Sequence, residues 1–148
     1  MNEGNITYRE MQLSDYDAVM ALWSEAEGLS LKDADSKEHI ARYLAHNPRL
    51  SYVAWQSTIL VGAVLVGTDG RRGYLQHLAV HSHYRGQGIA RQLIDRSLNQ
   101  LAEQGIAKTH LFVLNDNTQA QHFYEKLGWF ARDEVRMYSF NRSENDNV

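Results

Sequence analysis

The sequence has no cysteine among its 148 residues, a single proline (Pro48) and no long apolar run. Without cysteine the chain can form no disulfide, no thiolate metal site and no cysteine nucleophile. The longest mostly apolar stretch, residues 59–66, is far shorter than the roughly 20 residues that a membrane-spanning helix needs. Residues 1–10 lack the basic stretch followed by an apolar run that marks a secretory signal. We therefore expect a cytoplasmic protein without membrane association.

Positive charge is not in excess either, since 15 lysines and arginines face 18 aspartates and glutamates. A general nucleic-acid binder needs a basic face to neutralise phosphates, so no nucleic-acid partner is expected. Hydrophobic residues make up 43% of the chain and charged residues 22%, as in folded globular proteins. The length suits one domain with its own core. We expect a single domain over residues 1–148, with the polar residues 141–148 as a flexible tail.

Hydrophobic spacing and turn residues predict strands and helices in a mixed order. Ser14 and Asp17 resemble a capping box at the start of the first helix, and Asp69-Gly70 is a hairpin signal. The predicted strands cover residues 6–9, 51–55, 59–66, 74–80, 110–114 and 135–140. Helical spacing follows Ser14, precedes Pro48, begins again at Ile89 and ends before Gly128. This order predicts one mixed α/β sheet with helices on its faces.

The most informative stretch runs from a predicted buried strand through a glycine-bearing loop into a long amphipathic helix. Gly86 and Gly88 let consecutive backbone N–H groups point into one concavity at the helix N-terminus, which suits a phosphate or pyrophosphate. A plain strand-to-helix turn explains the two glycines about equally well. A dinucleotide-binding fingerprint would need a third glycine where Arg91 stands, and a P-loop would need Gly-Lys-Ser/Thr.

Two segments of this chain resemble the GNAT superfamily of acetyltransferases. The first is Arg85-Gly86-Gln87-Gly88-Ile89-Ala90, which fits the pattern Gln/Arg-x-x-Gly-x-Gly/Ala and follows the usual strand ending, here Leu78-Ala79-Val80. The second is Asn117-x-x-Ala120-x-x-Phe123-Tyr124-x-x-x-Gly128-Trp129. The resemblance extends over residues 6–140 and is closest to small stand-alone bacterial members, some akin to the acetyltransferases of ribosomal-protein N-termini. It implies a mostly antiparallel twisted sheet of about six to seven strands, flanked by about four helices.

The resemblance also implies a role for each matching residue towards acetyl-CoA. Backbone amides would hold the pyrophosphate, at Arg85, Gly86, Gln87, Gly88, Ile89 and Ala90. The main chain of Leu78, Ala79 and Val80 would pair with the pantetheine arm near a bulge in the strand. Asn117 would hydrogen-bond the pantetheine and Ala120 would leave room for it. Tyr124 would act as the general acid on the thioester sulfur, although as a sequence feature it also fits a core aromatic.

The implied reaction is direct attack of a neutral primary amine on the thioester, without a metal. Many relatives carry a glutamate as general base, but no carboxylate stands at the corresponding positions here. His77 is the candidate base, because imidazole titrates near neutral pH. Strand alternation would point His77 away from the face of Gln76 unless a bulge re-aims it. Proton loss through water is the alternative.

The sequence leaves the acceptor open between a small-molecule amine and a peptide or protein amine, and the oligomeric state open between monomer and homodimer. The acidic segment 25–35 would attract a cationic amine but also fits a solvated loop. His81 and His83 are read as a solvated loop rather than a metal site. Two other functions remain as alternatives: a non-catalytic CoA-binding or sensing module, and a nucleotide or phosphate binder that uses the glycine loop.

Overall fold

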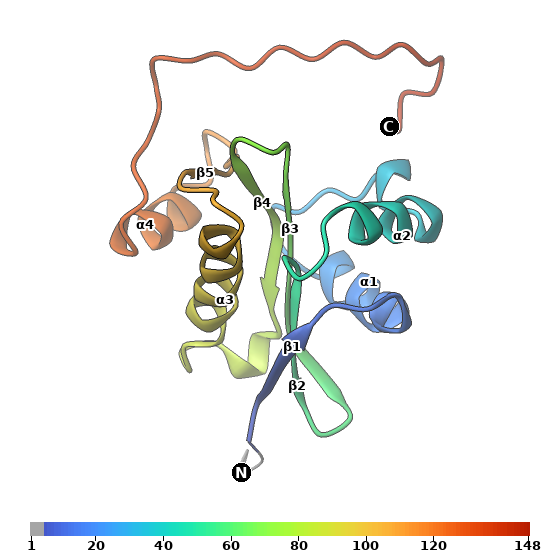
Figure 1. The fold of residues 1–148 in the computed structure, drawn as a ribbon, viewed down its shortest axis with the longest axis vertical. Helices are drawn as coiled ribbons and strands as arrows, with labels where there is room; N and C mark the ends of the chain where they lie inside the picture. The colour runs from blue at the N-terminus through green and yellow to red at the C-terminus, as the bar shows by residue number, and fades with distance from the viewer. Residues whose placement is uncertain (1–4) are drawn as a thin grey trace.

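A computed structural model describes residues 5–148. These residues contain one five-stranded mixed sheet (Figure 1). The strands lie in chain order across the sheet: β1 (Thr7–Glu10), β2 (Tyr52–Gln56), β3 (Ile59–Thr68), β4 (Gly73–Val80) and β5 (Thr109–His110). Strands β1 to β4 pair with one another in antiparallel fashion, and β5 runs parallel to β4. The predicted α/β class with a mostly antiparallel sheet is confirmed.

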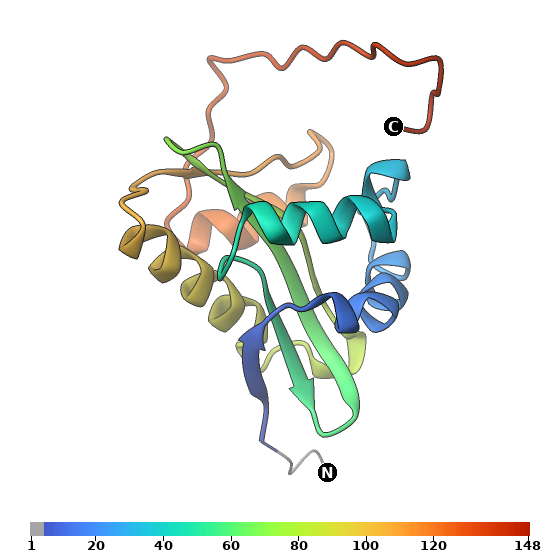
Figure 2. The ribbon, with the colours of Figure 1, turned by 45° about the vertical axis from the view of Figure 1, so that its right-hand side comes forward.

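Four α-helices cover the two faces of this sheet. They are α1 (Tyr16–Ser24), α2 (Lys37–His46), α3 (Ile89–Glu103) and α4 (Thr118–Lys126). Short 3-10 turns lie at Leu13–Asp15 (η1), Asp33–Asp35 (η2) and Ser82–Tyr84 (η3). Helices α1 and α2 lie on one face, and α3 and α4 on the other (Figures 1 and 2). Within residues 5–148 no helix is both long enough and apolar enough to cross a bilayer.

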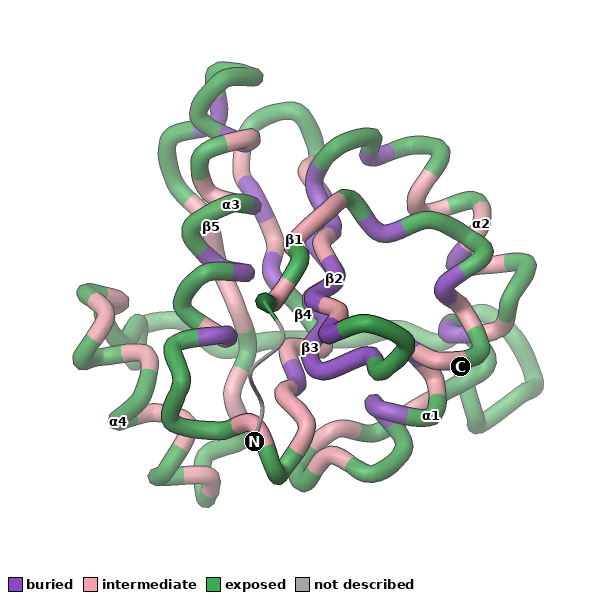
Figure 3. Tube along the Cα trace, turned by 90° about the horizontal axis from the view of Figure 1, so that it is seen from below, coloured by how far each residue is buried: buried purple, intermediate pink, exposed green. Residues whose placement is uncertain are grey.

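Each face of the sheet has its own apolar core, and the central strand β3 contributes to both. Its residues from Leu60 to Gly67 are all buried, which explains the continuous apolar run in the sequence (Figure 3). Gly62 sets how closely α3 approaches. A Cβ at this position would lie 3.0 Å from the side chains of Ile89 and Leu93. The first turn of α3 therefore packs directly onto β3.

The first helix does not begin as the sequence predicted. The Asp15 carboxylate accepts the backbone N–H of Gln12 at 2.8 Å, and α1 starts one residue later. The same carboxylate receives two hydrogen bonds from the Arg9 guanidinium, at 2.8 and 2.7 Å. The predicted capping box of Ser14 and Asp17 is wrong, because a buried aspartate satisfies the orphan amide instead.

The predicted last strand, residues 135–140, is also wrong, and the sheet has five strands rather than six to seven. Val135 is 63% exposed and Phe140 is 86% exposed. The neighbouring edge strand β5 has only two residues and offers too short a template for a further strand. The chain instead crosses the molecule to η2 (Figure 1). There the N–H of Asp33 donates to the carbonyl of Asn147 at 2.8 Å.

Candidate functional site

Strand β4 is paired differently at its two ends. Strand β3 lies beside it throughout, whereas β5 pairs only with Gly73 and Tyr74. The carbonyl of Val61 accepts the N–H of His81 at 2.8 Å, while Gly62 lies opposite Val80. That register makes Val80 part of a non-hydrogen-bonded pair with β3, so its N–H and C=O point to the opposite edge. This edge is open to an extended ligand.

A bulge lies in β4 between the paired end and the open end. Ala63 pairs with Ala79 and Leu65 with Gln76, so β4 has one more residue than β3 between these pairs. The backbone of His77 has a φ of +50°, a left-handed conformation that is uncommon for a histidine. The bulge predicted from the family resemblance is present, and it bends the strand where the edge becomes open.

The loop after β4 ends at the N-terminus of α3. Gly86 and Gly88 both have a φ of +81°, and Gly88 is the residue that precedes the first turn of α3. Left-handed backbone at these two places is easily adopted only by glycine. A Cβ at either glycine would meet nothing within 4 Å, so the surface above them is open. The unpaired amides of the first helical turn, including those of Ile89 and Ala90, face the same region.

Two further contacts hold this loop in place. The Tyr84 hydroxyl donates to Oε1 of Gln56 on β2 at 2.6 Å. Ile89 is 2% exposed and belongs to the core on the α3 face. Arg85 and Gln87 lie at the exposed surface. The loop is thus anchored to the core on one side and exposed to solvent on the other. This suits the binding of an anionic group by backbone amides and the helix dipole.

Helix α4 carries the second family segment. The Oδ1 atom of Asn117 accepts the N–H of Ala120 at 3.1 Å, so Asn117 caps the N-terminus of this helix. The Nδ2 atom of Asn117 lies close to Gly28, where a Cβ would come within 3.0 Å of it. The start of α4 is thus beside the loop that follows α1. The side chain of Ala120 is small and half-buried at this point.

Tyr124 lies on α4 and packs against the core of the α3 face, as Leu78 and Val80 of β4 do. Its ring contacts Phe123 and Trp129, with centroids 5.1 and 5.8 Å away. Burial raises the pKa of Tyr124 to about 12. The hydroxyl therefore keeps its proton throughout the pH range of ordinary enzyme activity and is available as a donor of a proton or hydrogen bond.

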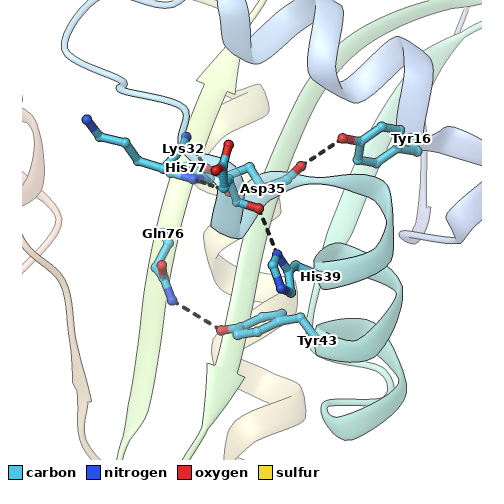
Figure 4. Close-up of polar contacts among 8 residues, drawn as sticks. Tyr16, Lys32, Asp35, His39, Tyr43, Gln76 and His77 are labelled. Carbon is cyan, nitrogen blue, oxygen red and sulfur yellow. Dashed lines mark hydrogen bonds and ion pairs between the residues drawn. The ribbon is translucent and has the colours of Figure 1, made fainter. Parts of the chain in front are cut away.

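His77 lies on the other face of β4, towards α1 and α2. Its Nε2 atom is 2.9 Å from Oδ1 of Asp35, and its ring meets the ring of Trp23 edge to face with centroids 4.9 Å apart. Gln76 faces the same side, because its Nε2 donates to the Tyr43 hydroxyl at 3.3 Å (Figure 4). Consecutive residues share a face only because the bulge turns one of them, so the bulge does re-aim His77.

Asp35 is the residue that the sequence did not single out. It is 6% exposed and belongs to η2, 42 residues before its partner His77. The signal present in the sequence was the acidic segment 25–35, but nothing there distinguishes the buried Asp35 from its exposed neighbour Asp33. The structure makes that distinction.

A cavity of about 590 Å³ lies on the same face, between η2, α2 and β4. Asp35, Tyr43 and Gln76 are among its lining residues. Burial raises the pKa of Tyr43 to about 12, despite the hydrogen bond from Gln76. Among the aromatic residues of the chain, Trp23 contacts His77 on this face, whereas Tyr138 is 85% exposed. In residues 5–148 no three histidine or acidic side chains are grouped to hold a metal ion.

The site therefore has two halves that meet at the open end of β4. The glycine loop, Tyr124, Leu78 and Val80 lie on the face of α3 and α4 or at the strand edge, and His77 with Asp35 lies on the face of α1 and α2.

Comparison with known proteins agrees with this geometry. Residues 16–129 match the sequence profile described as the acetyltransferase (GNAT) family. An acetyltransferase of Yersinia enterocolitica is 36% identical over 129 residues, which cover 87% of this chain and 91% of that protein. An acetyltransferase of Pectobacterium atrosepticum is 40% identical over the same shares of the two chains.

Solved structures show the same fold at lower identity. The PaiA N-acetyltransferase of Thermoplasma acidophilum, solved in complex with coenzyme A, has a TM-score of 0.77 and 18% identity, covering 87% of this chain and 92% of that one. Ard1 from Thermoplasma volcanium has a TM-score of 0.73 and 22% identity, covering 83% and 81%. Sequence motifs, sheet architecture and relatives all lead to one conclusion: the chain is an enzyme of the acetyltransferase (GNAT) family.

Proposed function

We propose that this protein is an N-acetyltransferase that moves the acetyl group of acetyl-CoA to a primary amine. The observation that carries the proposal is the open edge of β4, which lies between a bulge and the glycine loop at the start of α3. A pantetheine arm can pair with this edge as an added strand. The loop then receives the pyrophosphate.

The cofactor contacts follow from the positions of the residues around this edge. The main chain of Leu78, Ala79 and Val80 borders the pantetheine, with the outward N–H and C=O of Val80 available for hydrogen bonds. The amides of the loop bind the pyrophosphate, and they belong to Arg85, Gly86, Gln87, Gly88, Ile89 and Ala90. Asn117 and Ala120 border the pantetheine from α4, and Asn117 keeps its Nδ2 for this contact while Oδ1 caps the helix.

The chemistry requires one group to accept a proton and another to donate one. An alkylammonium has a pKa near about 10.4 and must lose a proton before it attacks. In this proposal His77 accepts that proton, and its contact with Asp35 supports the role. The thiolate of CoA needs stabilisation as it leaves, and the Tyr124 hydroxyl supplies it because burial keeps the phenol protonated.

The acceptor is a primary amine, either a small molecule or a peptide N-terminus. Relatives in fold include a structure described as ribosomal-protein-alanine N-acetyltransferase from Brucella melitensis and an Arabidopsis thaliana Naa50 bound to a bisubstrate analogue containing a peptide. These names support testing peptide acceptors beside polyamines.

The test is acetyl-CoA turnover, measured by release of free thiol with alanyl peptides, spermidine and simple alkylamines. The proposal expects thiol release that depends on one of these amines, together with a rise in melting temperature when acetyl-CoA or CoA is added. A thermal shift with CoA but no turnover with any amine would instead favour a non-catalytic CoA-binding module. No shift with CoA and a shift with ATP or NAD would exclude both.

A further inference from the structure

Asp35 is a buried carboxylate held by three different parts of the fold. Its carboxylate accepts the backbone N–H of Lys32 at 3.0 Å and meets Nε2 of His77 at 2.9 Å. The Tyr16 hydroxyl of α1 donates to its backbone carbonyl at 2.7 Å (Figure 4). A buried charge is costly unless it is paired and hydrogen-bonded. The partner of the Asp35 carboxylate is therefore His77 at the bulge of β4 and not a lysine or arginine at the surface.

The ionisation of Asp35 determines which nitrogen of His77 carries the proton. Burial by itself would raise the pKa of Asp35, but the hydrogen bonds from His77 and from the Lys32 amide outweigh it and lower this pKa below its usual value. An ionised carboxylate can only accept hydrogen bonds. Nε2 of His77 must therefore carry a hydrogen, and the neutral ring keeps its lone pair on Nδ1.

The surroundings of His77 hold the ring in this orientation. Its backbone is fixed by the bulge, Trp23 packs against the ring, and the side chain is 18% exposed. Titratable groups on the elements that cover this face include Tyr16 on α1, Lys32, Asp33 and Asp35 in and beside η2, and Glu38, His39, Arg42, Tyr43 and His46 on α2. Among these, Asp35 alone is hydrogen-bonded to the imidazole within residues 5–148. His39 is bonded elsewhere, with Nδ1 2.7 Å from the carbonyl of Asp33.

We propose that Asp35 is a positioning residue for the acetyl transfer, holding His77 as its Nε2–H tautomer so that Nδ1 removes the proton from the acceptor amine. This inference rests on the proposed acetyltransferase function. It supplies the carboxylate that the sequence lacked at the expected strand positions, and it brings that carboxylate from the loop before α2 instead of from the sheet.

Two protons leave the ammonium nitrogen during the proposed transfer. Nδ1 takes one proton from the ammonium nitrogen, and the imidazolium ion is stabilised by the Asp35 carboxylate. The freed lone pair of the amine forms the C–N bond as the C–S bond breaks, and the bonding pair leaves on sulfur. The Tyr124 hydroxyl gives its proton to this sulfur. The nitrogen, which still carries one excess proton after the C–N bond forms, then returns a proton to the Tyr124 oxygen. His77 then returns its proton to water, so one amide, one thiol and one proton are formed.

The kinetic test compares His77→Gln, Asp35→Asn and the double variant with the wild type, using an alanyl tetrapeptide and spermidine as acceptors. We expect kcat/KM to fall about 100-fold in His77→Gln, the size typical of a lost general base. Asp35→Asn should lower it at least about 10-fold. The double variant should be no slower than His77→Gln, because the two residues act as one unit. Glu38→Gln, an exposed carboxylate-to-amide change on α2, is the matched control and should leave turnover unchanged.

The second measurement needs no acceptor. Two-bond 1H–15N NMR correlations of the histidine rings report which nitrogen is protonated, and we expect His77 to be protonated on Nε2 in the wild type. Protonation on Nδ1, or wild-type kcat/KM in Asp35→Asn, would overturn the inference while leaving the acetyltransferase function intact. Loss of the acetyl-CoA thermal shift in the wild type would instead be a failure of the proposed function itself.

Discussion

The two ends of strand β4 show how one strand can serve both stability and binding. At Gly73 and Tyr74 the strand lies between β3 and β5, and Leu75 next to them is 3% exposed. From His77 to Val80, β3 is the one strand of residues 5–148 that pairs with it, and a bulge interrupts the regular pairing. The first end has its hydrogen bonds satisfied by the sheet. The second keeps backbone groups available, which is a cost to stability that a ligand can offset.

This difference explains why the motifs lie where they do. The glycine loop follows the open end directly, and α4 brings Tyr124 to the same side of the sheet. The hydrogen bond that anchors the bulge, between His77 and Asp35, comes from the other face. The paired end of β4 is held by buried apolar packing, such as that of Leu75. Substitutions at the two ends should therefore separate loss of binding from loss of stability.

The largest effect is expected at the glycine loop. Gly88→Glu places a negative charge and a strained left-handed residue at the anion site, and we expect acetyl-CoA affinity to fall at least about 100-fold by calorimetry, since pairing with the helix N-terminus is replaced by repulsion. Gly70→Glu is the matched control. Gly70 also has a positive φ, +96°, and open space around it, but it lies in the turn between β3 and β4. Equal losses in both variants would mean that strain rather than the site is responsible.

The paired end should respond in stability instead. Leu75→Ala removes a buried side chain from the α3-side core and should lower the free energy of unfolding by about 2–5 kcal/mol, measured by urea denaturation. Acetyl-CoA affinity of the folded protein should stay within about twofold of wild type. Weaker cofactor binding without a loss of stability would contradict the separation of the two ends.

Tyr124→Phe tests the acid at the open end. We expect kcat to fall about 10- to 100-fold with the acetyl-CoA affinity nearly unchanged, because the hydroxyl acts mainly on the leaving sulfur. Tyr74→Phe, at the paired end, is the control and should keep wild-type turnover. Because the pKa of Tyr124 is about 12, the acid is lost only as the pH rises through that value, and kcat should show no loss from this group up to about pH 10.

The smallest effect concerns acid stability. The pKa of Asp35 is lowered in the folded protein, so its ionised form stabilises the fold above the usual aspartate pKa of about 3.9, and this contribution fades as the pH falls below that value. We expect Asp35→Asn to be about 1 kcal/mol less stable than wild type at pH 6, with a deficit that shrinks as the pH falls below about 3.9 and through the lowered pKa of Asp35. The deficit of Leu75→Ala should not depend on pH. A pH-independent deficit in Asp35→Asn would mean that packing, not charge, is lost.

Local patterns in the sequence were sufficient for most of the architecture. The apolar run of residues 59–66 and the Asp69-Gly70 turn predicted the central hairpin, and the spacing from Ile89 predicted α3. The predictions failed where tertiary contacts decide. Residues 135–140 alternate like a strand but find no long edge to pair with, and the strand predicted at residues 110–114 is reduced to β5 at Thr109–His110.

Part of the candidate site could also be predicted from the sequence. The glycine loop could be found because its backbone conformation demands particular residues at fixed spacing. The direction of His77 could not, since one inserted residue in a strand reverses every later side chain. Asp35 is joined to the site only through folding, across 42 residues, and its burial has no local signature. The roles assigned to these residues in catalysis stay predictions until they are measured.

The most direct test of the account is amide hydrogen exchange of the wild-type protein with and without acetyl-CoA. The open edge and the loop should bind the cofactor, so exchange should slow at residues 78–80 and 85–90 while residues 73–75 stay unchanged. Slower exchange confined to η2 and α2, or no change at residues 78–80 and 85–90 under saturating acetyl-CoA, would contradict the assignment of the open end of β4 as the cofactor site.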